Sequence, residues 1–190
     1  MSQDPVTILV SIEGEVQTVS SGTAIASLLP DRTNPDGVLV VAAVVDNEIR
    51  ELGWEIREAC SIRFVDLRSE DGIRIYQRSL KFLLIKALHD CYPDRDIAIR
   101  HSVSKGIFFD VLGPALSGSE ISVLGDRMRE LVEMDLPFRK VTVSLDEARH
   151  VFRDAGRMDR LRAIQNREKD YVSIYLFEDV EDYFYGYMVP

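Results

Sequence analysis

The segment VLVVAAVV, residues 38–45, decides how the first part of the chain folds. Eight consecutive apolar residues, five of them valine, are typical of a central strand that is covered on at least one face. Before this segment, apolar and polar residues alternate from Val6 to Ile12, and Gly14 separates this run from a second one over residues 16–19. That pattern predicts a β-hairpin that leads into the central strand.

Short elements complete this first part of the chain. Ser21 or Thr23 can cap a short helix, and Asp46–Asn47 is a turn signal that follows the central strand. Two further strands are expected over residues 52–56 and 61–65. The order of hairpin, short helix, strand, short strand and strand predicts a ubiquitin-like β-grasp domain over residues 1–66.

The rest of the chain has the pattern of a mixed α+β domain. A polar stretch at residues 66–72 predicts a domain boundary. Capping boxes of the form S-x-x-E at Ser117 and Ser144 predict the starts of two helices. A further helix and four strands are expected over residues 80–91, 97–101, 107–112, 139–144 and 171–177. The predicted fold class is therefore α+β, with a second domain over residues 73–190.

Charge, cysteine spacing and missing motifs narrow the classes of function. The chain has 32 acidic and 23 basic residues, a formal charge of -9, which argues against a surface built to neutralise phosphates and makes RNA a weak candidate partner. Cys60 and Cys91 have no metal-ligand spacing around them, and GxxxxGK[ST], GxGxxG and HExxH are absent. The longest apolar run is far below the roughly 20 residues of a membrane span. We expect a soluble, cytoplasmic protein with no membrane partner, metal, cofactor or catalytic residue in this chain.

Four segments carry a resemblance to a known family: VDNEIREL at residues 45–52, RSLKF at 78–82, GIFFD at 106–110 and DYFYG at 182–186. On these segments, residues 6–72 resemble a TGS domain, which is a β-grasp fold. Residues 73–188 resemble the second N-terminal domain of threonyl-tRNA synthetase, the editing-type domain shared with alanyl-tRNA synthetases. The resemblance covers nearly the whole chain.

The editing chemistry of that family uses an HxxxH motif and a CxxxH motif. Two imidazoles one helical turn apart, with a thiolate and a further imidazole, form a metal-ligand set. At these four positions the present chain has Arg78, Phe82, Phe184 and Met188. The editing site is therefore degenerate, and the resemblance implies neither a zinc site nor hydrolytic editing here.

The substituted pattern is similar to that of bacterial uridine kinase-like proteins, in which a TGS domain and a synthetase-like domain precede a P-loop kinase domain. The similarity rests on residues 76–80, His101-Ser102, Lys105-Gly106 and residues 183–190. It implies a parent nucleoside kinase, an ATP-binding transferase that uses ATP and Mg²⁺. It also implies that the kinase domain follows in cis after Pro190 and is absent from this chain.

Five side chains are candidate contacts for a small-molecule or nucleotide ligand. Arg78 could bind a phosphate or carboxylate in bidentate fashion, or form a structural ion pair. His101 titrates near neutrality, and Lys105 precedes a glycine in a turn, but a hydrogen-bonded histidine and a solvated lysine are the alternatives. Tyr183 and Tyr185 could stack on a base or pack in the core.

Three hypotheses about function remain open. The leading one is a non-catalytic N-terminal regulatory or ligand-recognition region of a uridine kinase-like protein. The second is a tRNA-binding or editing-type module related to threonyl-tRNA synthetase, with basic residues between Arg153 and Lys169 as candidate RNA contacts. The third is a structural or dimerising domain, which predicts an exposed apolar patch and no ligand pocket.

Overall fold

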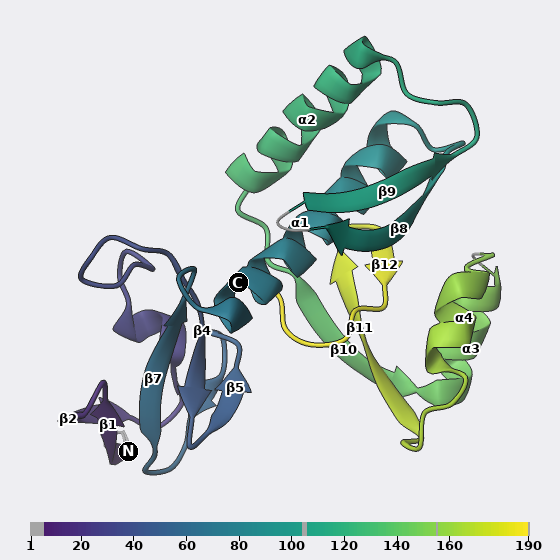
Figure 1. Cartoon of the computed structure of the whole chain (residues 1–190). Coiled ribbons are helices and arrows are strands. Elements are labelled where there is room, and N and C mark those ends of the chain that lie inside the picture. The colour runs from purple at the N-terminus through teal and green to yellow at the C-terminus, as the bar shows by residue number, and fades with distance from the viewer. Residues whose placement is uncertain (1–5, 104–105, 155, 190) are drawn as a thin grey trace, which may run out of the picture. The chain divides into compact units, whose positions relative to one another are not determined.

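The computed structural model describes residues 6–103, 106–154 and 156–189 (Figure 1). These divide into two compact units. The first comprises the chain up to Ser79 together with the segment from Gly186 onward, and the second runs from Leu80 to Tyr185. Both units combine helices and sheets, so the predicted α+β class is confirmed. The predicted domain limits at residues 66 and 73 stay a prediction.

The first unit is a five-stranded sheet in the order β2-β1-β7-β4-β5. Its strands are β1 Thr7–Ile12, β2 Glu15–Ser20, β4 Val40–Val45, β5 Glu48–Arg50 and β7 Ser61–Asp66. Strands β1 and β7 are parallel, and the other neighbours are antiparallel. A small pair, β3 Thr23–Ala24 with β6 Glu55–Ile56, and the 3-10 helix η1 Ile25–Leu28 complete the unit. This strand order is that of a β-grasp fold, as the sequence predicts.

Strand β4 lies at the centre of the first unit and is buried on both faces. Ala43 packs with Ile25 and Ile56 in the larger core, whereas Val41 packs with Ile75 in a second cluster on the other face. The central position predicted from the valine-rich run is confirmed. The helix expected after Ser21 or Thr23 is a single 3-10 turn.

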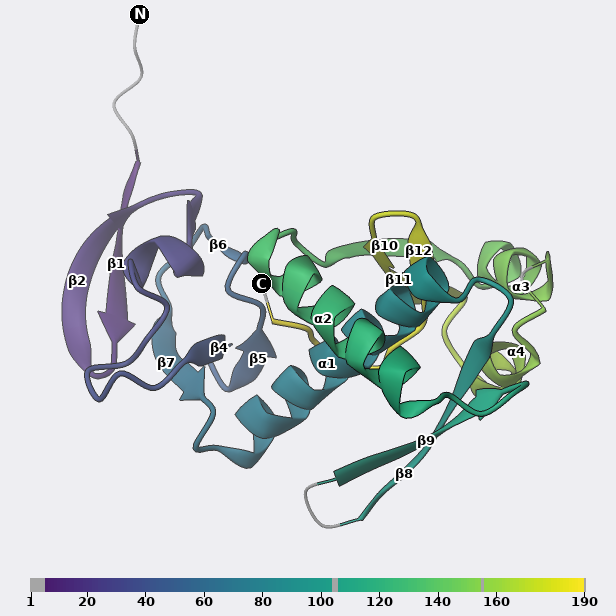
Figure 2. The same ribbon diagram turned by 90° about the horizontal axis from the view of Figure 1, so that it is seen from above.

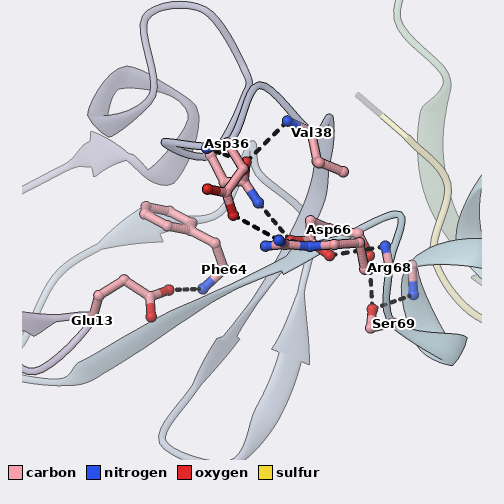
Figure 3. Close-up of polar contacts among 9 residues, drawn as sticks. Glu13, Asp36, Val38, Phe64, Asp66, Arg68 and Ser69 are labelled. Carbon is pink, nitrogen blue, oxygen red and sulfur yellow. Dashed lines mark hydrogen bonds and ion pairs between the residues drawn. The ribbon is translucent and has the colours of Figure 1, made fainter.

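Asp66, at the end of β7, collects several hydrogen bonds (Figure 3). Its Oδ2 accepts from Asn34 Nδ2 at 2.7 Å, from Arg68 Nε at 3.0 Å and from Arg68 Nη2 at 2.7 Å. Arg68 also donates to Asp36 at 2.6 Å. Hydrogen bonding from Arg68 is the main reason that the pKa of Asp66 is lowered. These bonds fasten the loop before β4 to the end of β7.

The next helix, α1 Glu70–Cys91, begins inside the polar stretch where the sequence predicts a boundary. Ser69 Oγ donates to the carbonyl oxygen of Asp66 at 2.8 Å and accepts from the backbone N–H of Gly72 at 3.0 Å, which caps the helix. A side chain on Gly72 would place its Cβ 2.0 Å from the Asp66 carbonyl oxygen. The first turn of α1 is therefore packed directly against the end of β7.

The second unit contains the remainder of α1, a two-stranded ribbon, a three-stranded sheet and three further helices (Figures 1 and 2). The antiparallel ribbon is β8 Asp96–Val103 with β9 Gly106–Leu112, and the antiparallel sheet has the order β10-β11-β12. Its other elements are α2 Gly118–Glu133, β10 Arg139–Ser144, α3 Leu145–Asp154, α4 Met158–Ile164, β11 Tyr171–Phe177 and β12 Val180–Asp182. The predicted hairpin and the two long strands are confirmed.

Both predicted capping boxes are present in the second unit. Ser117 Oγ accepts from the backbone N–H of Glu120 at 3.3 Å, and Ser144 Oγ accepts from that of Glu147 at 3.2 Å. Helices α3 and α4 pack on one face of the sheet through a cluster that includes Phe152, Ile164, Val172 and Ile174. Among the described helices, none has the length and apolar character that crossing a bilayer requires.

Candidate functional site

Phenyl rings occupy the part of the second unit where the resembled family places editing residues. The ring centroid of Phe82 lies 5.4 Å from that of Phe184, 5.6 Å from that of Phe138 and 6.2 Å from that of Phe177. Phe82 and Phe177 are fully buried. Phenyl rings offer no nitrogen, oxygen or sulfur ligand, so Phe82 and Phe184 do not fit the zinc ion of an editing site.

The other two substituted positions lie in the first unit. Arg78 Nη1 donates to the carbonyl oxygen of Tyr187, and a Cβ built on Gly186 would lie 2.8 Å from the guanidinium carbon of Arg78. Met188 is buried, with its sulfur 3.6 Å from Ser79 Oγ. The guanidinium group of Arg78 thus contacts the main chain of the C-terminal segment. Its ligand-binding role stays a prediction.

The remaining candidates fall into different surroundings. The side chain of His101 and the whole of Lys105 lie outside the described residues. Tyr183 packs against the α3–α4 cluster, and its hydroxyl accepts from Arg167 Nη1 at 2.8 Å. Tyr185 is 81% exposed. Of the two tyrosines, only Tyr185 presents its ring openly, and stacking on a base stays a prediction for both.

Asp182 is a buried carboxylate that the sequence analysis did not select. It is 0% exposed and accepts from Arg160 Nε at 2.5 Å, from Arg160 Nη2 at 2.9 Å and from Arg157 Nη2 at 3.1 Å. The backbone N–H of Tyr183 also donates to it at 2.7 Å. Two arginines of the basic stretch are therefore bound to an internal carboxylate. The aspartate directly before the aromatic residues 183–185 is the signal that could have indicated this site.

Lys86 is a second charged group that sequence reasoning missed. Its Nζ atom, on a side chain only 5% exposed, lies 2.6 Å from both Asp90 Oδ1 and Asp179 Oδ1 and 3.3 Å from Glu178 Oε2. Burial alone would lower the pKa of Lys86, but hydrogen bonds to Asp179, Asp90 and Glu178 outweigh burial and raise it. The helical spacing of Lys86 and Asp90 was visible in the sequence, but the contact with Asp179 joins residues 93 positions apart.

His89, Asp90 and Asp179 have ligand atoms within 4.8 Å of one another, a spacing that would suit a cation. However, Lys86 Nζ already lies at hydrogen-bond distance from both carboxylates, and Arg127 donates to Asp90 at 2.8 Å and 2.9 Å. These cations supply the positive charge that a metal would bring. The cluster is therefore an ion network rather than a metal centre.

This network predicts how the stability of the second unit depends on pH. Burial alone would raise the pKa of Asp90, but hydrogen bonds from Lys86 and Arg127 outweigh burial and lower this pKa. A hydrogen bond from Lys86 also lowers the pKa of Asp179. Lowered carboxyl pKa values give stability that is present above about pH 4 and is lost as pH falls further. The raised pKa of Lys86 gives stability that is lost only above about pH 10.

We expect the melting temperature of the protein to fall between about pH 5 and pH 3 and to fall less steeply in Lys86→Met. Thermal denaturation by circular dichroism across this range measures both slopes. Equal slopes in the two proteins would show that the network does not bind protons differently in the folded and unfolded states.

One face of β10 and β11 carries hydroxyl groups and Lys140, and it is at least partly exposed at every position except Tyr175, which is fully buried. Strand register pairs Lys140 with Tyr175, Thr142 with Ser173, and Ser144 with Tyr171, so these six residues share one face. The Nζ atoms of Lys140 and Lys169 lie 5.7 Å and 5.4 Å from the ring centroids of Tyr175 and Tyr171. None of the six face positions is a carboxylate. This face, which we call the lysine–hydroxyl face, suits an anionic ligand with hydrogen-bonding groups.

No protein-family model matches the chain. The chain is 24% identical over 181 residues to the threonine–tRNA ligase of Desulforamulus reducens. The matched region covers 94% of this chain and 28% of the ligase. It is 25% identical to the threonine–tRNA ligase of Saccharophagus degradans, over 95% of this chain and 27% of the ligase. It is 29% identical to that of Syntrophotalea carbinolica, over 79% of this chain and 24% of the ligase. The chain thus spans about a quarter of the length of these curated relatives. The resemblance to threonyl-tRNA synthetase is supported, and these relatives are ligases rather than kinases.

Proposed function

We propose that this chain is a tRNA-synthetase-related module that binds RNA and has no metal-dependent editing chemistry. The observation that carries the proposal is the similarity of up to 95% of the chain to part of threonine–tRNA ligases. Proteins with that name act on threonine and tRNA, so RNA is the partner class that the similarity favours. Phe82 and Phe184, at two editing positions, cannot hold a metal ion or activate a water molecule.

The lysine–hydroxyl face is the surface that we assign to the RNA. Lys140 and Lys169 provide positive charge for phosphates, and the hydroxyl groups of Thr142 and Ser173, 3.4 Å apart, offer hydrogen bonds to phosphate or ribose oxygens. The net acidic charge of the protein does not oppose this, because the six positions carry no carboxylate and Asp182, which pairs with Tyr175 in the sheet, is fully buried and bound by Arg157 and Arg160. Binding to one local face predicts a modest number of phosphate contacts and a correspondingly modest dependence on salt.

Replacing Lys140 by alanine is expected to weaken tRNA binding and to reduce by about one the slope of log K against log salt concentration. Fluorescence anisotropy with labelled tRNA over a salt series measures both effects. Arg139→Ala is the matched control, because Arg139 is the preceding residue of the same strand and lies on the opposite face. It should leave the slope nearly unchanged.

The proposal is wrong if the wild-type protein shows no salt-dependent binding of tRNA, or if Arg139→Ala reduces binding as much as Lys140→Ala. A parallel assay addresses the chemistry. Incubation with mischarged tRNA and added zinc should release no amino acid, because the phenyl cluster replaces two of the editing ligands. Release above the uncatalysed rate would contradict the non-catalytic part of the proposal.

A second candidate function is the regulatory or ligand-recognition region of a nucleoside kinase. The observation that favours it is the substituted segment Asp182–Met188, on which the resemblance to uridine kinase-like proteins rests. A nucleoside that binds the native state must raise the melting temperature. A shift with uridine or ATP but none with tRNA would favour this candidate over RNA binding.

A further inference from the structure

Strand β2 forms one edge of the five-stranded sheet in the first unit, and β1 is its one neighbour among the described strands (Figure 2). The two strands pair over six consecutive residues without a bulge. Natural sheets protect exposed edges with lysine, proline, bulges or very short strands. Strand β2, with the sequence EVQTVS, has none of these, whereas β5 at the opposite edge has only three residues. The free edge of β2 is therefore an unprotected site for pairing with another strand.

The hairpin determines which backbone groups of β2 point outward. Its two-residue turn, Glu13 and Gly14, has φ values of 51° and 90°, which are typical of a type I′ turn. Such a turn closes on a hydrogen-bonded pair, here Ile12 with Glu15, and hydrogen-bonded pairs then recur at every second residue. The intervening residues of β2, all exposed, direct their N–H and C=O groups away from β1; they are Val16, Thr18 and Ser20.

The spacing of these outward groups fits a second copy of the same strand. In an antiparallel pair centred on Thr18, Val16 of each copy lies opposite Ser20 of the other, and the two Thr18 residues lie opposite each other. All three are hydrogen-bonded pairs, so six backbone hydrogen bonds form. A shift of the register by two residues in either direction leaves four such bonds between strand residues. The centred register thus satisfies every outward group of β2.

The side chains of β2 are compatible with this register. Glu15 is the only charged residue of the strand, and it lies opposite the uncharged Ser21 of the second copy, so like charges do not meet. The pairs join residues of the same sheet face, so the exposed face that carries Val16 and Thr18 continues across both copies. Val16 is 72% exposed, and Ser20 of the second copy shields part of it from water.

We propose that β2 is a homodimerisation strand, which pairs antiparallel with β2 of a second copy of this chain and joins the two five-stranded sheets into one. Two six-residue strands bury less than the roughly 800 Å² per partner of a standard interface, so the dimer is weak and forms at micromolar or higher concentration. Each copy has a formal charge of -9, so screening by salt strengthens the dimer. RNA binding weakens with salt and is assigned to β10 and β11, so the two proposals are independent.

Sedimentation velocity from about 1 µM to about 500 µM tests the proposal. The wild-type protein should shift from monomer to dimer over this range, and more completely at high salt. Thr18→Lys should weaken the dimer by about tenfold or more, because two ammonium groups then meet at the centre of the strand pair. The matched control is Leu9→Lys, which adds the same charge to the same face, opposite Thr18 on β1. Its two copies lie about 14 Å apart, three strand spacings, so this variant should dimerise nearly as the wild type does.

Hydrogen exchange locates the interface. In the dimer the backbone N–H groups of Val16, Thr18 and Ser20 are bonded, so their exchange should be slower at about 500 µM than at about 1 µM. The fluorescence of Trp54, which packs against the larger core of the first unit, shows whether each variant is folded. A wild-type protein that stays monomeric at every concentration would overturn the proposal. So would a Thr18→Lys protein that dimerises as strongly as Leu9→Lys, or a dimer in which these three N–H groups exchange as fast as in the monomer.

Discussion

Replacing Gly72 by alanine is expected to lower the free energy of unfolding of the first unit by about 3 kcal/mol. On an exposed helix the same change would stabilise the protein, because alanine is the better helix former. Here the added Cβ would lie 2.0 Å from the carbonyl oxygen of Asp66, and both atoms are tied to the backbone, so α1 or the end of β7 must move. That movement would break the cap formed by Ser69.

Denaturation followed by the fluorescence of Trp54 measures this effect. Trp54 is the only tryptophan of the chain and packs against the larger core of the first unit. Gly118→Ala is the matched control, because Gly118 also lies in the first turn of a helix and a Cβ there would meet nothing within 4 Å. The control should be neutral or slightly stabilising. Equal stability of Gly72→Ala and the wild type would show that the turn is not packed as described.

Replacing Asp182 by asparagine should destabilise the second unit by about 3 kcal/mol or more. The amide is nearly the same size as the carboxylate, so the cavity does not change. The amide has no negative charge, however, and its nitrogen cannot accept a hydrogen bond, which leaves the guanidinium groups of Arg157 and Arg160 without their internal counter-ion. The loss of charge, rather than of packing, is thus the expected cause.

Thermal denaturation by circular dichroism or calorimetry measures the effect of this change. Asp146→Asn provides the control, because Asp146 also forms an ion pair with an arginine, Arg149, but the side chain of Asp146 is 83% exposed. Exposed pairs contribute little, so this variant should stay within about 0.5 kcal/mol of the wild type. An Asp182→Asn protein as stable as its control would mean that the buried carboxylate is not required to balance the two arginines.

The parts of the fold that could be predicted from the sequence are those with a local cause. The valine-rich run predicts β4 because such a run is typical of a covered central strand, and the structure buries this strand on both faces. The capping boxes at Ser117 and Ser144 begin helices through bonds that span three residues. Short elements were missed. Strand β5 is only three residues long after the turn at Asp46–Asn47, and β12 is equally short, so neither has room for a periodic pattern.

The candidate site was harder to predict because its contacts are not local. Arg160 and Asp182 are 22 positions apart, and helix α4 falls in a stretch whose many charges conceal its apolar positions. The sequence predicts candidate RNA contacts among these basic residues, and the pattern does not show that Arg157 and Arg160 bind an internal carboxylate. RNA contact by this stretch stays a prediction. The lysine–hydroxyl face depends on the pairing of β10 with β11, which no pattern in either strand specifies.

The contact between Arg78 and Gly186 links two positions that are far apart in the sequence. A Cβ at position 186 would lie 2.8 Å from the Arg78 guanidinium carbon, and Gly186 has a φ of 104°, which disfavours other residues. A larger residue at position 186 therefore becomes tolerable only together with a shorter side chain at position 78. Such a pair is expected to co-vary in descendants of this sequence: the arginine persists where the glycine persists, and neither is free to drift alone.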